Sequence, residues 1–146
     1  MNTSRKLAPS RSLVLFSSLI SVIIGYAIYY AFTEGNELVR IAVIIAAALL
    51  LLPILKMPIK IYQDNDSICI QQVMGERKFL KQEYTINQVK TNGLFSIRLF
   101  ATSFFVYLGY FWTKSTGVFY AQCVSSSNLI MLTKKSDGTK IVIDAP

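Results

Sequence analysis

The chain of 146 residues contains no histidine and only two cysteines, Cys69 and Cys123. Histidine is the side chain used most often as a general base and as a metal ligand, so the commonest catalytic and metal chemistry is missing. The two cysteines lie far apart without zinc-binding spacing, and no base is identifiable that would activate either thiol. We therefore predict that the protein is not an enzyme and has no catalytic residues, metal site or other cofactor. Both cysteines are expected to be buried and reduced.

Motifs for other ligands are also missing from the sequence. It has no glycine-rich phosphate loop. Asp64 and Asp66 resemble the start of a calcium loop, but the later Gly and Glu of an EF-hand are absent, so a solvated turn is preferred. The net charge of +7 is spread along the chain and is not part of a recognisable nucleic-acid reader. No small-molecule substrate and no nucleic acid is predicted as a partner.

Charged residues are scarce, at 16% against about a quarter in soluble domains. They are absent from two apolar stretches, Ser12 to Thr33 and Ile41 to Leu55. A hydrocarbon core of about 30 Å needs roughly 20 apolar residues per helix. The sequence therefore predicts a membrane helical hairpin, with a basic N-terminal tail over 1–11, transmembrane helices over 12–33 and 38–56, a short loop over 34–37, and a β domain over 57–146.

Basic residues predict how the hairpin is oriented. Arg5, Lys6 and Arg11 precede the first helix, and Lys56 and Lys60 follow the second. Because Lys and Arg accumulate in cytoplasmic flanks, we expect a multi-pass protein of the cell membrane with both termini and the β domain in the cytoplasm. A cleaved signal peptide is the alternative, but its apolar region would be only about 7 to 15 residues long.

Small residues recur every fourth position in both helices. Ser17, Ser21 and Gly25 share one face of the first helix, and Ala42 and Ala46 share one face of the second. Small side chains let helices approach closely in lipid, so we expect these residues to pack the hairpin. A homo-oligomer or a partner helix on the same stripe is the alternative. No charged residue lies in the middle of either span, which favours an anchor over a transport pathway.

From Ile59 onward the pattern alternates as in β-strands. Runs 59–63 and 68–73 flank an Asn/Asp turn and predict a hairpin. Runs 129–133 and 140–144 flank Asp137-Gly138, which is a strong hairpin signal. Further strands are expected over 78–84, 95–100, 103–110 and 118–124, with a turn at Asn92-Gly93. Short, evenly spaced strands predict a small barrel or sandwich.

The uncharged segment Leu99–Trp112 has an alternative as a third membrane segment. It is shorter than a span and rich in Thr, Phe, Val and Tyr, so two core strands are preferred. Some of its aromatic residues could instead form a wedge that enters the membrane interface or grips a partner.

Ile97–Phe111 resembles the "arginine, phenylalanine, small, small, aromatic, tyrosine, glycine, aromatic" signature of bacterial pleckstrin-homology-like (PH-like) domains. Asn128–Leu132 followed by Asp137–Ile143 resembles the closing hairpin of that family. The resemblance covers about Ile59 to Pro146 and implies a PH-like barrel behind transmembrane helices. The chain departs from the pattern at Ala101 and Val106, where the family is Gly-rich, and we expect the family's C-terminal capping helix to be missing. Such a domain would need the hairpin, a second copy or another protein to cover its open end.

Basic residues around the turns of the β domain are candidates for contact with lipid headgroups. Near an anionic leaflet each cation could add on the order of 1 kcal/mol of attraction. The alternative is that they are solvated and protect strand edges from aggregation. The candidates are Arg77, Lys78, Lys81, Lys134 and Lys135.

These features predict a membrane-anchored binding or scaffold module that presents a PH-like β domain at the cytoplasmic membrane surface for protein–protein assembly. Its expected partners are membrane lipids and a membrane protein or a second copy of the chain. One alternative is a structural subunit that contacts a larger membrane complex through its hairpin. Another is an anionic-lipid-binding module.

Overall fold

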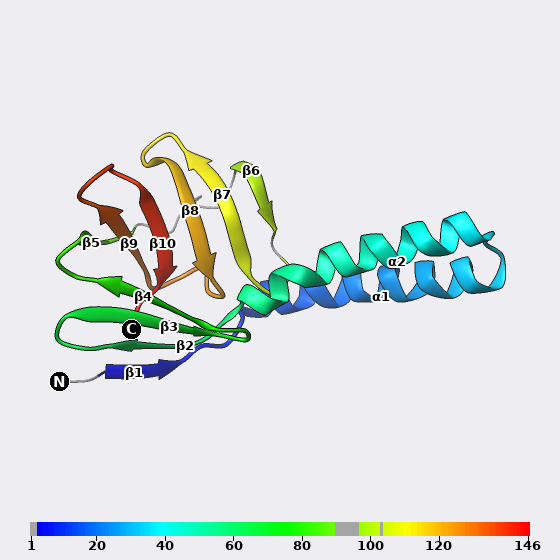
Figure 1. The fold of residues 1–146 in the computed structure, drawn as a ribbon, viewed down its shortest axis with the longest axis horizontal. Helices are drawn as coiled ribbons and strands as arrows, with labels where there is room; N and C mark the ends of the chain where they lie inside the picture. Colours follow the sequence, from blue (N-terminus) through cyan, green and yellow to red (C-terminus); the bar gives the residue numbers. More distant parts are fainter. Residues whose placement is uncertain (1–2, 90–96, 103) are drawn as a thin grey trace.

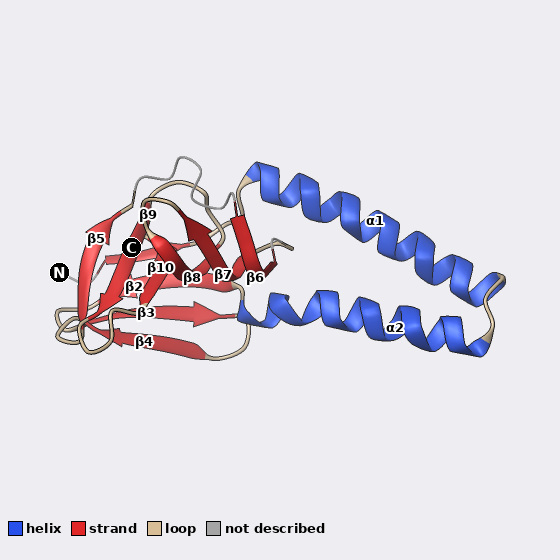
Figure 2. Ribbon diagram, turned by 90° about the horizontal axis from the view of Figure 1, so that it is seen from above, coloured by secondary structure: helices blue, strands red, loops and turns tan. Residues whose placement is uncertain are grey.

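The computed structural model describes residues 3–89, 97–102 and 104–146. Two apolar helices project from one end of a β domain that contains two sheets (Figures 1 and 2). The predicted helical hairpin with a β domain is therefore confirmed. Neither sheet closes into a barrel, so the domain consists of two packed sheets. The predicted turn at Asn92-Gly93, and the residues Phe95 and Ser103 at which two strands were expected to begin, lie outside the described residues.

The hairpin consists of α1 (Arg11–Thr33) and α2 (Glu37–Leu51), which continues as the 3₁₀ helix η1 (Leu52–Lys56). Both helical segments are long and apolar enough to cross a membrane, with mean hydropathies of 2.0 and 2.8. Pro53 lies in the first turn of η1. Since proline removes a backbone donor, it accounts for the change from α-helix to 3₁₀ helix at this point.

Polar groups close the connection between the helices. The Asn36 side chain caps α2 by accepting a hydrogen bond from the Val39 N–H at 3.0 Å. Arg40 folds back and donates to the carbonyl oxygens of Ala31 at 3.2 Å and Phe32 at 3.3 Å. These carbonyls lie in the last turn of α1, where they lack helical partners and where a cation is favoured by the helix dipole. Arg40 therefore stabilises the tip of the hairpin.

Strands are arranged in two sheets. The four-stranded sheet has the order β1-β2-β3-β4 and the six-stranded sheet has the order β5-β9-β10-β8-β7-β6, with β8 and β10 parallel. The bounds are β1 Thr3–Lys6, β2 Pro58–Gln63, β3 Ser67–Gln72, β4 Glu76–Leu80, β5 Tyr84–Gln88, β6 Ile97–Thr102, β7 Tyr107–Thr113, β8 Gly117–Cys123, β9 Leu129–Lys134 and β10 Lys140–Asp144.

The first and last predicted hairpins are confirmed. Strand β2 pairs with β3, and β9 pairs with β10, both antiparallel. The single strand predicted over 78–84 is wrong, because a turn at 81–83 separates β4 from β5 and places them in different sheets. Leu99–Trp112 spans most of an antiparallel β6–β7 pair, as the strand interpretation predicted.

The β domain contains two hydrophobic clusters, because side chains of β10 alternate between the two faces of the six-stranded sheet. Ile141 and Ile143 of β10 point to the cluster between the sheets, together with Ile61, Ile68 and Phe79. The intervening Val142 points to the opposite face of the six-stranded sheet, into a second cluster with Phe111, Phe119, Ala121, Cys123 and Leu129. Since side chains alternate along a strand, this sheet is apolar on both faces.

The segment before α1 was predicted to be a basic tail, but its residues Thr3–Lys6 form β1 and pair with β2. Leu7 packs against the cluster between the sheets, and its N–H donates to the Ile59 carbonyl at 2.8 Å. The N-terminal segment therefore belongs to the β domain and helps to enclose its core. Both described chain ends lie in this domain, on the same side of the helices (Figure 1).

Candidate functional site

The β domain has two distinct ends, which we name by their position relative to the helices. The helix-proximal end contains the start of β2, which follows η1 directly, and the β3–β4 turn. The distal end contains the β2–β3 turn, the segment 81–83 and the β9–β10 turn. A six-residue strand separates the two ends by about 20 Å.

At the helix-proximal end, the β6–β7 connection packs against α1. The Phe105 N–H donates to the Ser17 Oγ at 2.7 Å. Leu13 and Ser17 are buried in α1, and Phe104 and Val106 are buried in the connection. The aromatic residues at this point therefore contact the protein's own first helix.

A second attachment joins η1 to the β3–β4 turn. The Val73 N–H donates to the Met57 carbonyl and the Met74 N–H donates to the Leu55 carbonyl, each at 3.0 Å. From β8, the Gln122 side chain donates to the Lys56 carbonyl at 2.9 Å. Because the domain is bound to both helices, it cannot swing away from them without breaking these hydrogen bonds.

Most of the small-residue stripe is exposed in the single chain. Ser21, Gly25, Ala42 and Ala46 are all exposed, and a Cβ added at Gly25 would meet nothing within 4 Å. Only Ser17 of the predicted set is buried, and it contacts the β domain instead of α2. The helices are farther apart at the β domain than at their connecting loop (Figure 2). These exposed residues form no seam between the two helices in the single chain, and their packing role, within the hairpin or against another helix, stays a prediction.

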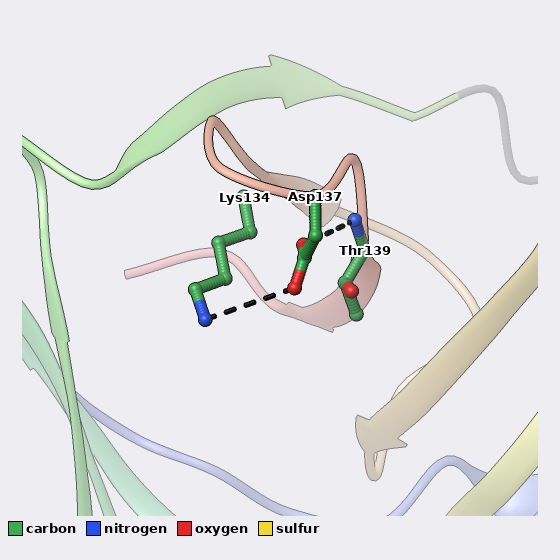
Figure 3. A network of polar contacts seen from close by, with 3 residues as sticks. All are labelled: Lys134, Asp137 and Thr139. Atoms are coloured by element: carbon green, nitrogen blue, oxygen red, sulfur yellow. Dashed lines mark hydrogen bonds and ion pairs between the residues drawn. The ribbon is translucent and has the colours of Figure 1, made fainter.

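Three of the five predicted lipid-contacting residues lie at the distal end. Lys81 donates to the carbonyls of Asp64 at 2.6 Å and Asn65 at 3.0 Å. Lys134 lies 3.8 Å from the Asp137 carboxylate, which also accepts the Thr139 N–H at 2.9 Å (Figure 3). This N–H and the lysine charge hold the pKa of Asp137 below its usual value.

Lys135 lies in the same β9–β10 turn, and its N–H donates to the Glu83 carbonyl at 2.8 Å. Lys81, Lys134 and Lys135 therefore lie at the end of the β domain that is far from the helices, and their contact with headgroups stays a prediction. Lys78 is exposed in the middle of β4.

Arg77 is the member of the set that lies at the helix-proximal end. Its guanidinium group donates to the Gln122 Oε1 at 3.2 Å. It also lies over the rings of Phe79 at 5.3 Å and Tyr120 at 5.6 Å. Burial raises the pKa of Tyr120, and the positive charge of Arg77 opposes that rise. Hydrogen bonding and ring contacts hold Arg77 in one position.

Asp144 is a buried carboxylate that the sequence analysis did not identify. It accepts hydrogen bonds from the N–H groups of Val124 at 2.9 Å and Ser125 at 3.1 Å. Burial raises its pKa to about 6, while these two donors and the charge of Arg5 act in the opposite direction. Both cysteines are buried, as predicted, and burial raises the pKa of Cys123. Within the described residues, no group of three or more His, Cys, Asp or Glu is arranged to hold a metal ion.

Strand β5 is an edge strand that the sequence analysis missed. Thr85, Ile86, Asn87 and Gln88 are exposed, and among the described residues only β9 pairs with this strand. Of the edge strands β1, β4, β5 and β6, only β5 carries no charged residue. Edge strands are usually protected by charges or proline, and within the described part of the chain neither protects the outer backbone groups of β5.

Comparison with known proteins finds no family model, no curated protein and no solved structure that matches this chain. The PH-like resemblance therefore stays a prediction that rests on the residues quoted above.

Proposed function

We propose that the protein is a non-enzymatic, membrane-anchored binding module whose PH-like β domain pairs with an extended segment of a partner protein at the cytoplasmic membrane surface. The single observation that carries this proposal is the uncharged outer edge of β5, with which no described residue pairs. An extended peptide can add a strand to such an edge, with main-chain hydrogen bonds giving affinity and side-chain contacts giving specificity.

The backbone groups available on β5 follow from its pairing with β9. The Lys135 N–H donates to the Glu83 carbonyl, and the Val89 N–H donates to the Leu129 carbonyl. Hydrogen-bonded pairs alternate in an antiparallel ladder, so residues 83, 85, 87 and 89 bond toward β9. The backbone groups of Tyr84, Ile86 and Gln88 therefore point toward the outer edge.

The attachment of the domain to both helices supports the anchoring part of the proposal. The hydrogen bonds from Phe105 to Ser17 and from Met74 to Leu55 fix the domain beside the apolar helices. A partner bound to β5 would therefore be held within a few strand lengths of the membrane surface.

Ile86→Pro tests this proposal. Proline removes the outward N–H of residue 86 but none of the donors that bond to β9, so the domain should stay folded while strand addition is lost. Ile86→Ala is the matched control, because it removes the same side chain and keeps the N–H. The measurement is co-purification of partner proteins with the full chain from membranes. Equal recovery with both variants would contradict strand addition at β5.

A structural subunit that binds a complex through its hairpin is the second candidate. The observation that favours it is that Ser21, Gly25, Ala42 and Ala46 face outward in the single chain. Outward small residues allow another helix to approach closely. For this candidate, Gly25→Leu would abolish assembly and Ile86→Pro would not.

A further inference from the structure

An apolar groove lies at the helix-proximal end, where η1 meets the β domain. It has a volume of about 640 Å³ and is lined by Leu52, Pro53, Leu55, Lys56, Met74, Gly75 and Leu108. This volume is in the range of small-ligand sites, which is about 300 to 1,000 Å³. Since η1 ends the second apolar helical segment, the groove lies where that segment meets the polar domain.

A polar recess of about 280 Å³ adjoins this groove at Lys56, which lines both. The other residues around the recess are Gln72, Glu76, Arg77, Tyr120 and Gln122. The hydrogen bond to Gln122 and the rings of Phe79 and Tyr120 hold the Arg77 guanidinium in place. A fixed guanidinium suits a phosphate group because it can donate two parallel hydrogen bonds.

The charges of the recess are not balanced within the described residues. Among the described residues the only ion pair is Lys134 with Asp137, which lies at the distal end and not in the recess. Neither Arg77 nor Lys56 therefore has a carboxylate partner in the described part of the chain. Glu76 also lines the recess, but its carboxylate accepts a hydrogen bond from the Tyr62 hydroxyl. Two cations therefore face one carboxylate that is already bound elsewhere.

Gln72 is a second, independent indication of a ligand. The residue is only 7% exposed, and its side-chain amide makes no hydrogen bond to any described residue. Buried amides nearly always have hydrogen-bond partners, because an unsatisfied buried amide destabilises the fold. A ligand oxygen in the recess would accept a hydrogen bond from this amide.

We infer that the groove and the recess together bind an anionic phospholipid, with its phosphate in the recess and an acyl chain along the groove. Lys56 and Arg77 supply the positive charge, and Gln72 supplies a neutral donor. Leu55, Met74 and Leu108 supply apolar contact. An amphiphile fits this pair of sites because the apolar and the cationic parts adjoin at the end of a helix that is long enough to span a membrane. The inference is independent of strand addition at β5, because no residue of β5 lines the groove or the recess.

The test uses full-length protein in nanodiscs of phosphatidylcholine with a minority of phosphatidylglycerol. The protein is released into mild detergent, and the retained lipid is measured by native mass spectrometry. We expect phosphatidylglycerol to be enriched over its share of the bilayer. Lys56→Gln with Arg77→Gln should lower this enrichment by at least about tenfold, since each lost charge-assisted hydrogen bond costs roughly a factor of ten.

Lys134→Gln is the control, because it removes a positive charge from the distal end instead of the recess, and it should leave the enrichment unchanged. Arg77→Lys, which keeps the charge but loses the two-donor geometry, should give an intermediate value. Equal retention of both lipids by the wild type, or an equal loss in Lys134→Gln, would overturn the inference.

Met74→Asp tests the apolar part and covers the case in which the double variant fails to fold. Met74 is 68% exposed, so the change leaves the core intact, while a charge in the groove should exclude an acyl chain and lower lipid retention. Glycerophosphoglycerol, which is the same headgroup without acyl chains, should fail to displace the bound lipid. Full retention in Met74→Asp, or displacement by the free headgroup, would show that the groove does not hold an acyl chain.

Discussion

The two ends of the β domain use the same kinds of charged residue in different ways. At the distal end, Lys81 donates to turn carbonyls and Lys134 pairs with Asp137. At the helix-proximal end, Arg77 is held by an amide and two aromatic rings, with no carboxylate among the described residues paired to it. The distal cations therefore close turns, whereas the proximal cations are available to a ligand.

The comparison shows that position relative to the helices decides what a basic residue can do. All these residues look alike in the sequence, as lysines and arginines beside turns. The chain direction of β4 places Arg77 near the helices and Lys81 one strand length away from them. If this is right, substitutions at the helix-proximal end should lower the free energy of unfolding more than matched substitutions at the distal end.

Ser17→Leu should have the largest effect on stability, because it overfills a buried contact and removes the acceptor of the Phe105 N–H. We expect a loss of about 3 kcal/mol. Gly25→Leu is the matched control on the same helix and should change the stability of the single chain by less than about 0.5 kcal/mol, since its Cβ meets open space. Urea unfolding of the full chain in detergent, followed by the fluorescence of Trp112, measures both. Equal losses would show that α1 is not attached through Ser17.

Asp144→Ala should cost about 2 kcal/mol, because it leaves the N–H groups of Val124 and Ser125 without an acceptor. Asp144 follows Ile143, which pairs with Gln122 at the helix-proximal end. Its counterpart at the distal end is Asp137→Ala, which removes an exposed carboxylate from a turn and should cost less. The same unfolding measurement compares them. A larger loss for Asp137→Ala would reverse the ranking of the two ends.

The two carboxylates should also give opposite pH dependences. The pKa of Asp144 is raised from 3.8 to about 6, so the folded state binds its proton more tightly and the free energy of unfolding falls as pH rises through that window. The pKa of Asp137 is lowered from 3.8, so its contribution is present above pH 3.8 and is lost as pH falls below that value. Asp144→Asn should remove the fall between pH 3.8 and about 6. If the slope in this window stays unchanged, Asp144 is not its source.

Arg77→Ala should lose a smaller amount of stability, about 1 kcal/mol, from one hydrogen bond and the contacts with Phe79 and Tyr120. Lys134→Ala should lose less than about 0.5 kcal/mol, because exposed ion pairs contribute little. Thermal unfolding of both variants at one pH and ionic strength compares them. If Lys134→Ala loses as much as Arg77→Ala, the two cations are held equally firmly.

The sequence predicted the helices and the first and last hairpins because their patterns are strong and local. Uncharged runs of sufficient length define the helices, and Asp137-Gly138 between β-branched residues defines the last hairpin. Strands β1 and β5 were missed because Thr3–Lys6 and Tyr84–Gln88 are largely polar, as edge strands can be, and show no apolar alternation.

The candidate site was harder to predict than the fold. Nothing local in the sequence separates Arg77 from Lys81, since their difference depends on the direction of β4 relative to η1. The Gln72 amide and the Asp144 carboxylate are ordinary residues until burial and neighbouring groups are known. The small-residue stripe follows a real spacing, but spacing alone does not say which neighbour a helix face meets.

The most direct test of the central claim is photocrosslinking in native membranes from a photoreactive residue at position 88, at the exposed end of β5. The account predicts a protein adduct that is lost in Ile86→Pro and kept in Ile86→Ala, because only the proline removes an outward backbone donor. An adduct that survives Ile86→Pro, or one that forms only from a photoreactive residue at position 25 in the hairpin, would contradict the account.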